Sequence, residues 1–359
     1  MQAAQYYGRE DVRIEDVDTQ TLGPGDVRID VAACGVCGTD ITQYVKGPLA
    51  VPVDEPHPVT GRTLPITLGH ELSGVVAEVG EDIATASVGD RVTVNPLVPC
   101  RTCSYCLRGQ YRFCEQLANI GLHGNGGGFA ESLVAPASSV HGLPTKLPLD
   151  LGALVEPLSV SLHAVRRSGI AAGDSIIVFG SGPIGLGVVQ MARAAGARRV
   201  FVSEPRDRRR RLAAELGATT VFDPSETDPV ASIRDRTGVG VDASVEAAGT
   251  EATVNAAIET TRKGGEIVSL AAARDVTIQP NEQFVMTERS LTGSFGYDCT
   301  PFADDGEFAG VMTLLADGRV DGETMVTHRI GLSDLVEGGL ERLADPDGDA
   351  VKILVSPNR

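Results

Sequence analysis

Four cysteines close together in the chain could bind one metal ion. They follow the spacing Cys100-x2-Cys103-x2-Cys106-x7-Cys114. Four thiolates in one loop suit a tetrahedral zinc ion that is enclosed by protein and only stabilises the loop. An iron–sulfur cluster is the alternative, because Cys-x2-Cys-x2-Cys also occurs in ferredoxins. Here the fourth cysteine is not at x3 followed by proline, and the sequence has no second cluster motif, so we predict structural zinc.

A glycine-rich turn, Gly180-Ser-Gly182-Pro183-Ile184-Gly185, could bind a dinucleotide. It follows an apolar run that predicts a buried strand, and a helical pattern begins directly after it. The first glycine allows a tight turn, the second lets the backbone approach a pyrophosphate, and the third lets the helix pack on the strand. The free amides and positive dipole end of the helix then attract the phosphates.

An acidic residue, Glu204, ends the next predicted strand at about the 20-residue spacing of dinucleotide sites. Its carboxylate should bind the adenosine ribose and repel a 2′-phosphate, so we predict NAD rather than NADP. Arginines at 206 and 208–211 follow directly, and any of them could instead hold that phosphate. The segments 246–249 and Leu270-Ala-Ala272 are expected to border the nicotinamide, with packing at strand ends as the alternative.

A more dispersed set of residues could hold a second metal ion. Cys37, His70 and Glu156 offer a thiolate, an imidazole and a carboxylate, and these three ligands with an open position suit a catalytic zinc. Each residue also has an ordinary interpretation, as a buried thiol, a hydrogen-bonded histidine and a solvated charge. The residues alone leave both interpretations open.

The surrounding elements suggest two domains. Residues 1 to about 95 contain short alternating runs bounded by glycine and proline, which predict β-strands, and another β segment follows the cysteine-rich stretch. The proline-rich stretch 47–65 should be a long loop with His57 exposed. Between about 156 and 299, helical and strand patterns alternate, which predicts an α/β fold with a doubly wound parallel sheet. The last segment, 300–359, should return to the first domain.

Composition restricts the class of protein. The chain has 359 residues and a net charge of −17, so we do not expect nucleic acid as a partner. Only four lysines occur beside many aspartates, which suggests a salt-adapted acidic surface, although a GC-rich genome would also favour arginine. No apolar run is long enough to span a membrane and no signal-peptide pattern opens the chain, so we expect a cytoplasmic protein.

In order and spacing, these motifs resemble the zinc-dependent medium-chain alcohol dehydrogenase family over essentially the whole chain. The segments that carry the resemblance are 34–40, 69–71, 88–92, 100–114, 127–131, 156–160 and 180–185. The resemblance implies a GroES-like catalytic domain, residues 1–155 with 300–359, and a Rossmann NAD-binding domain, residues 156–299. It also implies a homodimer or homotetramer.

The resemblance is strongest to the polyol branch of the family. The insertion within 47–65 and Phe295-Gly-Tyr297 point to members that oxidise 2,3-butanediol to acetoin. The expected activity is hydride transfer from a secondary alcohol of a diol or polyol to NAD. The alternatives are oxidation of sorbitol, xylitol, another sugar alcohol or threonine and, from another class, a non-catalytic protein that binds NAD and zinc.

By resemblance, Cys37, His70 and Glu156 bind the catalytic zinc. Glu71 either exchanges onto the metal or supports it from nearby. Thr39 takes the place of the hydroxyl residue that bonds the substrate hydroxyl and passes its proton outward.

At two positions the residue type differs from that of similar family members, and at a third position an arginine agrees with the family. Thr42 stands where close relatives carry a histidine that relays the proton to solvent. Asp298 stands where butanediol enzymes tend to have arginine. By position in the family, Arg209 lies beside the adenosine, and most of the neighbouring arginines should be on a solvated helix face.

Overall fold

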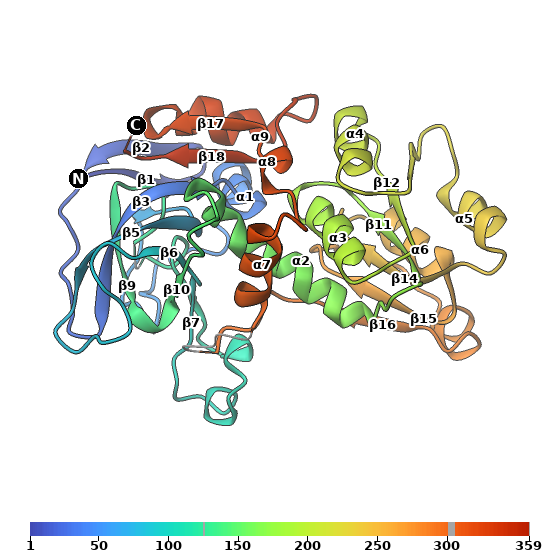
Figure 1. Cartoon of the computed structure of the whole chain (residues 1–359), viewed down its shortest axis with the longest axis horizontal. Helices are drawn as coiled ribbons and strands as arrows, with labels where there is room; N and C mark the ends of the chain where they lie inside the picture. Colours follow the sequence, from blue (N-terminus) through green and yellow to red (C-terminus); the bar gives the residue numbers. More distant parts are fainter. Residues whose placement is uncertain (125, 301–305, 359) are drawn as a thin grey trace. The chain divides into compact units, whose positions relative to one another are not determined.

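The structure is a computed structural model that describes residues 1–124, 126–300 and 306–358. Its contacts divide the chain into two compact units (Figure 1). The first contains Met1–Glu156, Asp298–Ala316 and Val326–Arg359, and the second contains Pro157–Tyr297 and Asp317–Met325. The segment Asp317–Met325 therefore packs with the second unit, whereas the sequence placed it in the first.

The first unit consists mainly of antiparallel strands. Its largest sheet has the order β10-β6-β5-β3-β18-β17, and β9 also pairs with β3. Smaller sheets have the orders β2-β1-β4 and β7-β8. The strands are β1 (Gln2–Gly8), β2 (Asp11–Asp16), β3 (Asp26–Gly35), β4 (Ile66–Thr67), β5 (Glu71–Val79), β6 (Arg91–Val94), β7 (Leu97–Val98), β8 (Ala118–Asn119), β9 (Ser132–Pro136), β10 (Val140–Gly142), β17 (His328–Gly331) and β18 (Ile353–Ser356). The helices are α1 (Gly38–Lys46), α7 (Glu307–Ala316) and α9 (Arg342–Ala344).

Strand β3 shows why the alternating pattern forms this sheet. Val27, Ile29 and Val31 are buried, whereas Arg28 and Asp30 between them remain partly or fully accessible. Apolar residues spaced by two enter the core, because successive side chains of a strand point to opposite faces. The core of this unit gathers such residues from β1, β3, β5, β6 and β18.

The predicted loop at 47–65 is confirmed, since no helix or strand interrupts these fully described residues between α1 and β4. The expectation of an exposed His57 is wrong. Its ring is half-buried and stacks on His123, with ring centroids 4.5 Å apart.

The second unit is a doubly wound parallel sheet, as predicted. Its strand order is β13-β12-β11-β14-β15-β16. Successive strands are added on one side of β11 up to β13 and on its other side from β14 onward, so the strand order reverses between β11 and β14. The strands are β11 (Ser175–Phe179), β12 (Arg199–Ser203), β13 (Thr220–Phe222), β14 (Val241–Glu246), β15 (Thr261–Ser269) and β16 (Ser290–Gly293). The helices are α2 (Val155–Ser168), α3 (Pro183–Ala194), α4 (Asp207–Glu215), α5 (Pro229–Thr237), α6 (Glu251–Thr260) and α8 (Gly322–Met325).

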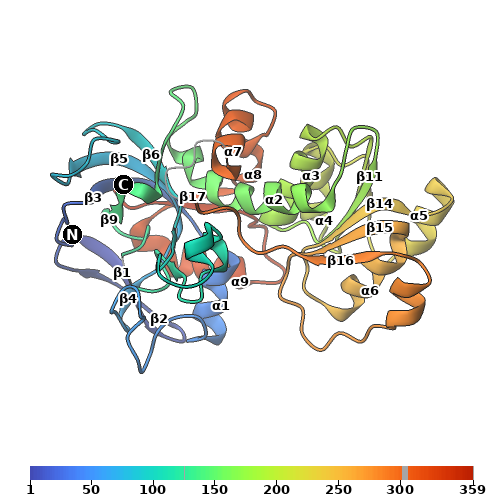
Figure 2. The ribbon, with the colours of Figure 1, turned by 90° about the horizontal axis from the view of Figure 1, so that it is seen from below.

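Helices cover this parallel sheet. Helix α3 packs on β11 and β12 and α4 on β12 and β13, whereas α6 packs on β14 and β15 and contacts α5 (Figure 2). Phe179, Phe201 and Ile267 are buried in the core of this unit. The near-continuous apolar runs of β11 and β12 follow from burial on both faces of a parallel sheet.

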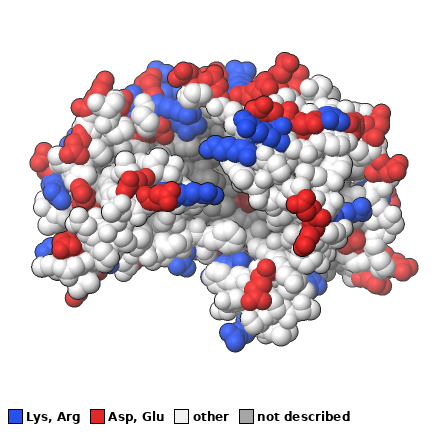
Figure 3. Space-filling view, turned by 180° about the vertical axis from the view of Figure 1, so that it is seen from behind, with Lys and Arg blue, Asp and Glu red and all other residues white. Residues whose placement is uncertain are grey.

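Acidic side chains are spread over the surface. On the face drawn in Figure 3, Asp and Glu are not gathered in one patch, and Lys and Arg lie between them. Within the described ranges, no helix is both long and apolar enough to cross a bilayer.

Candidate metal and cofactor sites

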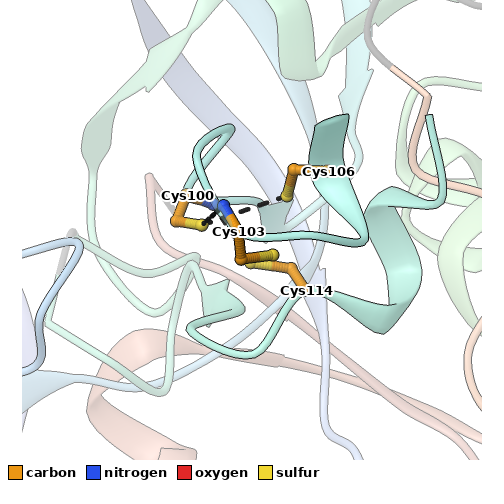
Figure 4. Close-up of side chains that lie close together, drawn as sticks. All are labelled: Cys100, Cys103, Cys106 and Cys114. Atoms are coloured by element: carbon orange, nitrogen blue, oxygen red, sulfur yellow. Dashed lines mark hydrogen bonds between the residues drawn. The ribbon is translucent and has the colours of Figure 1, made fainter. Parts of the chain in front are cut away.

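The four cysteines of the lobe at 100–114 lie together. Each of the four sulfur atoms lies within 4.8 Å of the other three. Figure 4 shows the side chains turned toward one another, and the Sγ atoms of Cys100 and Cys106 are 4.0 Å apart. The cluster consists only of thiols from one short segment, which is the donor set of a closed structural zinc site.

Hydrogen bonds favour the thiolate form of part of this cluster. The hydroxyl and amide of Thr102 and the amide of Cys103 donate to Cys100 Sγ. These bonds, led by the Thr102 hydroxyl, lower the Cys100 pKa to about 6. Burial instead raises the pKa of Cys106 and Cys114. A zinc ion would supply the positive charge that the two buried thiolates need.

A second group of donors forms where three strands of the main sheet meet. Cys37 follows the end of β3 and caps helix α1, and its amide donates to Asp40 Oδ2 at 2.9 Å. Glu71 begins β5 and lies opposite Gly35 of β3, which places His70 beside Cys37. Potential ligand atoms of Cys37, His70 and Glu71 all lie within 4.8 Å of one another.

The second donor group carries an excess of negative charge. Burial alone would lower the His70 pKa, but the charges of Cys37, Asp40 and Glu156 raise it well above its usual value. Two buried atoms, Asp40 Oδ1 and His70 Nδ1, have no hydrogen-bond partner among the residues that the structure describes, and they lie 3.7 Å apart. A bound cation would satisfy this charge, so a thiolate, an imidazole and a carboxylate here fit zinc.

The two candidate carboxylates are placed differently. Glu71 belongs to the close donor group, but its Oε2 accepts a hydrogen bond from the buried ammonium of Lys352. Glu156 lies in the first turn of α2, is buried, and acts electrostatically on both His70 and Lys352. It is not a member of the group whose atoms lie within 4.8 Å of one another.

The predicted proton-transfer residues lie around the start of α1. Thr39 Oγ1 is 3.7 Å from Cys37 Sγ, so its hydroxyl is next to the donor group. Thr42 is exposed, and its hydroxyl donates to the Gly38 carbonyl at 2.8 Å. Asp298 Oδ1 accepts hydrogen bonds from the amide and hydroxyl of Thr300.

The glycine-rich turn has the local geometry that a dinucleotide needs. Gly180 has a φ of +86°, which favours glycine, and a Cβ at Gly185 would collide with the Gly180 carbonyl oxygen. Gly182 caps α3, and a Cβ there would meet only Arg209 Nη1, at 3.7 Å. Pro183 and Ile184 form the first turn, so the open space at Gly182 lies at the positive end of this helix.

Glu204 lies beside this turn with its side chain fixed. It is 3% exposed, and its carboxylate accepts hydrogen bonds from the amides of Ser181 (2.8 Å) and Arg206 (3.0 Å). Arg210 is not on a solvated face, because it pairs with Asp223 at 2.7 Å. Arg210 also donates to the Glu204 and Pro205 carbonyls, so it is not available for a phosphate.

The segments expected at the nicotinamide come to the same edge of the sheet. A Cβ at Gly180 would lie 3.0 Å from Ala248 Cβ, and one at Gly249 would lie 3.3 Å from Ala271 Cβ. Leu270 is half-buried and Ala272 is exposed, and both follow the end of β15. The carboxyl ends of β11, β14 and β15 therefore meet at the point where the strand order reverses, the usual ligand position in such sheets.

Comparison with known proteins places this geometry in a family. Residues 23–145 match the model of the alcohol dehydrogenase GroES-like domain, and residues 183–317 match that of the zinc-binding dehydrogenase. The chain is 41% identical to (R,R)-butanediol dehydrogenase of Bacillus subtilis, and the match covers 100% of both chains. The chain belongs to the zinc-binding alcohol dehydrogenase family.

Solved structures of this family support the same assignment. The crystal structure of 2R,3R-butanediol dehydrogenase from Bacillus subtilis matches with a TM-score of 0.92 over 99% of both chains. A putative zinc-binding dehydrogenase from Sinorhizobium meliloti 1021, bound to NADP, is 34% identical and matches with a TM-score of 0.87 over 99% of both chains. The predicted family, the two-part fold and the dehydrogenase class are thus confirmed, and zinc and a nicotinamide dinucleotide are the cofactors of this zinc alcohol dehydrogenase.

Sequence reasoning missed two residues that contact the second donor group, Asp40 at His70 and Lys352 at Glu71. Asp40 belongs to a motif that carried the resemblance, but its position facing His70 was not predicted. Lys352 was noted only as one of the four lysines of the chain. A lysine ahead of a strand gives no local signal, since its role here depends on the pairing of β18 with β3.

Proposed function

We propose that this zinc alcohol dehydrogenase oxidises a vicinal diol, with 2,3-butanediol as the best candidate and acetoin as its product, using NAD. The observation that carries the proposal is the close group of half-buried Cys37 with buried His70 and Glu71, in a chain matched over its whole length by butanediol dehydrogenases. Conversion of the secondary alcohol to a ketone requires loss of a hydroxyl proton and a hydride.

We assign Cys37, His70 and Glu156 as ligands of the catalytic zinc, and the four cysteines of the lobe as ligands of a structural zinc. When bound, the catalytic zinc is a Lewis acid that lowers the pKa of the alcohol hydroxyl. Asp40 faces His70 Nδ1 and would hold the imidazole in one tautomer and orientation. The burial of Glu156 and its effect on the His70 pKa support the choice of this carboxylate.

Thr39 is the proposed acceptor of the hydroxyl proton. Its Oγ1 lies 3.7 Å from Cys37 Sγ, beside the donor group. Thr42 lies one turn further along α1 and is exposed. Its hydroxyl donates a hydrogen bond to the Gly38 carbonyl. Water around Thr42 would therefore complete the path to solvent, in place of a histidine.

NAD is the proposed cofactor, and its nicotinamide would accept the hydride. The turn 180–185 would hold the pyrophosphate, and Leu270 and Ala272 would border the nicotinamide. The fixed, buried carboxylate of Glu204 would bind the ribose and repel a 2′-phosphate. Arg209, close to the open space at Gly182, would lie beside the adenosine.

We further propose a homo-oligomer that includes contacts at the edge of the parallel sheet. Strand β16 is the terminal strand of that sheet, and Val285, Met286 and Leu291 near it are 71%, 68% and 42% exposed. Unpaired strand edges with apolar neighbours favour association. Light scattering of the wild-type protein and of Leu291→Lys tests this, and an unchanged mass for the variant would contradict an interface at β16.

The activity is tested by NAD reduction with a panel of alcohols, at low and high salt. The panel contains (2R,3R)- and meso-butanediol, sorbitol, xylitol, threonine and simple alcohols, with acetoin for the reverse reaction. Turnover confined to vicinal diols is the expected result. Turnover confined to sugar alcohols or threonine would reject the butanediol assignment.

Metal analysis distinguishes an enzyme from a non-catalytic protein that binds NAD and zinc. We expect zinc in both donor groups. A protein that retains zinc only in the four-cysteine lobe, and that turns over none of the panel, would support the non-catalytic alternative.

A further inference from the structure

Lys352 and Glu71 form a completely buried ion pair next to the second donor group. Their side chains are each 1% exposed, and Lys352 Nζ donates to Glu71 Oε2 and, at 3.1 Å, to the carbonyl of Val36. Burial lowers the Lys352 pKa, but the charges of Glu71 and Cys37 outweigh it and raise the pKa. Both of its hydrogen-bond partners are acceptors, which is the surrounding that an ammonium group requires.

The strand register and a glycine at position 35 leave room for this ion pair. Strand β18 pairs with β3 so that Leu354 lies opposite Gly35, and β3 pairs with β5 so that Gly35 lies opposite Glu71. A Cβ at Gly35 would collide with Glu71 Oε2 and lie 3.0 Å from Lys352 Nζ. The volume that a side chain at position 35 would occupy is thus filled by the carboxylate of Glu71 and the ammonium group of Lys352.

This arrangement puts Glu71 between two kinds of partner. One of its oxygens binds Lys352, yet the carboxylate also belongs to the donor group with Cys37 and His70. A buried charge without a counterion is strongly disfavoured. Without the ammonium group, the nearest compensation for Glu71 would be a metal ion held by Cys37 and His70.

We propose that Lys352 is a positioning residue that keeps Glu71 off the catalytic metal, so that one coordination position stays open for the alcohol. This rests on the proposed function of Cys37, His70 and Glu156. A fourth protein ligand would give the metal the closed coordination of a structural site. Lys352 thereby determines which of the two carboxylates, Glu71 or Glu156, completes the site.

The test replaces zinc in this site by cobalt while the cysteine lobe retains zinc, because the visible spectrum of cobalt reports its coordination. Lys352→Met should change this spectrum and lower kcat/KM for the diol by about 10- to 100-fold, the size of loss that is usual when a residue just outside a metal site is removed. The double variant Lys352→Met/Glu71→Gln should restore the wild-type spectrum, since an amide carries no charge to compensate. Lys352→Arg should also keep it, and exposed Lys146→Met is the matched control.

Glu71→Gln alone provides a measurement that does not depend on the folding of Lys352→Met. It should leave the cobalt spectrum unchanged, because Glu71 is not a ligand in the wild-type protein. A changed spectrum in Glu71→Gln, or an unchanged one in folded Lys352→Met, would overturn this inference and leave the proposed enzyme function intact. A wild-type protein that takes up no cobalt at this site would overturn both.

Discussion

The imidazole rings of His57 and His123 stack with their centroids 4.5 Å apart and their planes within 11° of each other. The Nδ1 of His57 accepts from the Val59 amide at 3.3 Å, and that of His123 accepts from the Asn119 amide at 2.8 Å. A protonated Nδ1 could not accept these bonds, so both rings are neutral. The pair joins the loop at 47–65 to the segment after β8.

This pair predicts a loss of stability in mild acid. Burial lowers the pKa of both rings, and the repulsion from His57 in its protonated form lowers the pKa of His123 further. In the unfolded chain each histidine has a pKa of about 6.5, so below that pH the unfolded state binds more protons. The stabilisation is complete above about pH 6.5 and is lost as the pH falls from there toward the lowered folded-state pKa values.

Urea unfolding between pH 7.5 and 5.5 measures this effect. The free energy of unfolding should fall toward pH 5.5, and His57→Phe, which keeps a ring in the stack, should reduce the slope. The reduction should be smaller than the ~1.4 kcal/mol per pH unit that one full proton gives. An identical slope in the variant would show that the pair is not responsible.

Glu204 should decide the choice between NAD and NADP. Within the part of the chain that the structure describes, its buried carboxylate forms no ion pair with an arginine side chain, so its charge would face a 2′-phosphate directly. We expect kcat/KM for NAD to exceed that for NADP by at least about tenfold, equivalent to ~1.4 kcal/mol. Glu204→Gln should reduce this ratio by at least about tenfold. Exposed Glu215→Gln is the control, and a wild-type ratio below tenfold would reject the assignment.

The features that were predictable from the sequence are local in the chain. The cysteines of the lobe lie within one short segment, and Gly180, Gly182 and Gly185 lie within one turn between a strand and a helix. Their geometry follows from spacing and from a few backbone angles, so the residue types alone indicate the chemistry.

The features that could not be predicted depend on pairing between distant segments. Glu71 and Lys352 are 281 residues apart and meet only because β5, β3 and β18 pair in a particular register. His57 was predicted to be exposed because its neighbours are prolines, but a stacking partner from another loop half-buries it. Most of the arginines that follow Glu204 were predicted on a solvated helix face, and nothing in the sequence indicated that Asp223, after β13, binds Arg210.

The two metal sites should separate stability from catalysis. Cys100→Ala removes a ligand whose zinc holds the lobe together, so we expect loss of the lobe zinc and a lower melting temperature. His70→Ala should retain the fold and the lobe zinc but lower kcat by about 10³-fold or more, corresponding to several kcal/mol of Lewis-acid stabilisation. Metal analysis, thermal unfolding and steady-state kinetics measure these effects.

A second cysteine variant controls for the loss of a thiol as such. Cys299 is buried and belongs to neither donor group, so Cys299→Ala should retain the zinc of both sites. Equal loss of folding in Cys100→Ala and His70→Ala would contradict the separation of roles.

The glycine-rich turn offers a similar separation between folding and cofactor binding. At Gly185 a Cβ would collide with the Gly180 carbonyl, so Gly185→Ala must push α3 away from β11 and should cost about 1–3 kcal/mol of stability. At Gly182 the backbone has a φ of −67°, which alanine adopts, and the nearest atom to a Cβ is 3.7 Å away. Gly182→Ala should therefore fold normally but raise the Kd for NAD by at least about tenfold, because its methyl group occupies the space proposed for the pyrophosphate. Thermal unfolding without cofactor and calorimetric titration with NAD separate the two effects, and normal NAD affinity in Gly182→Ala would exclude the pyrophosphate from this turn.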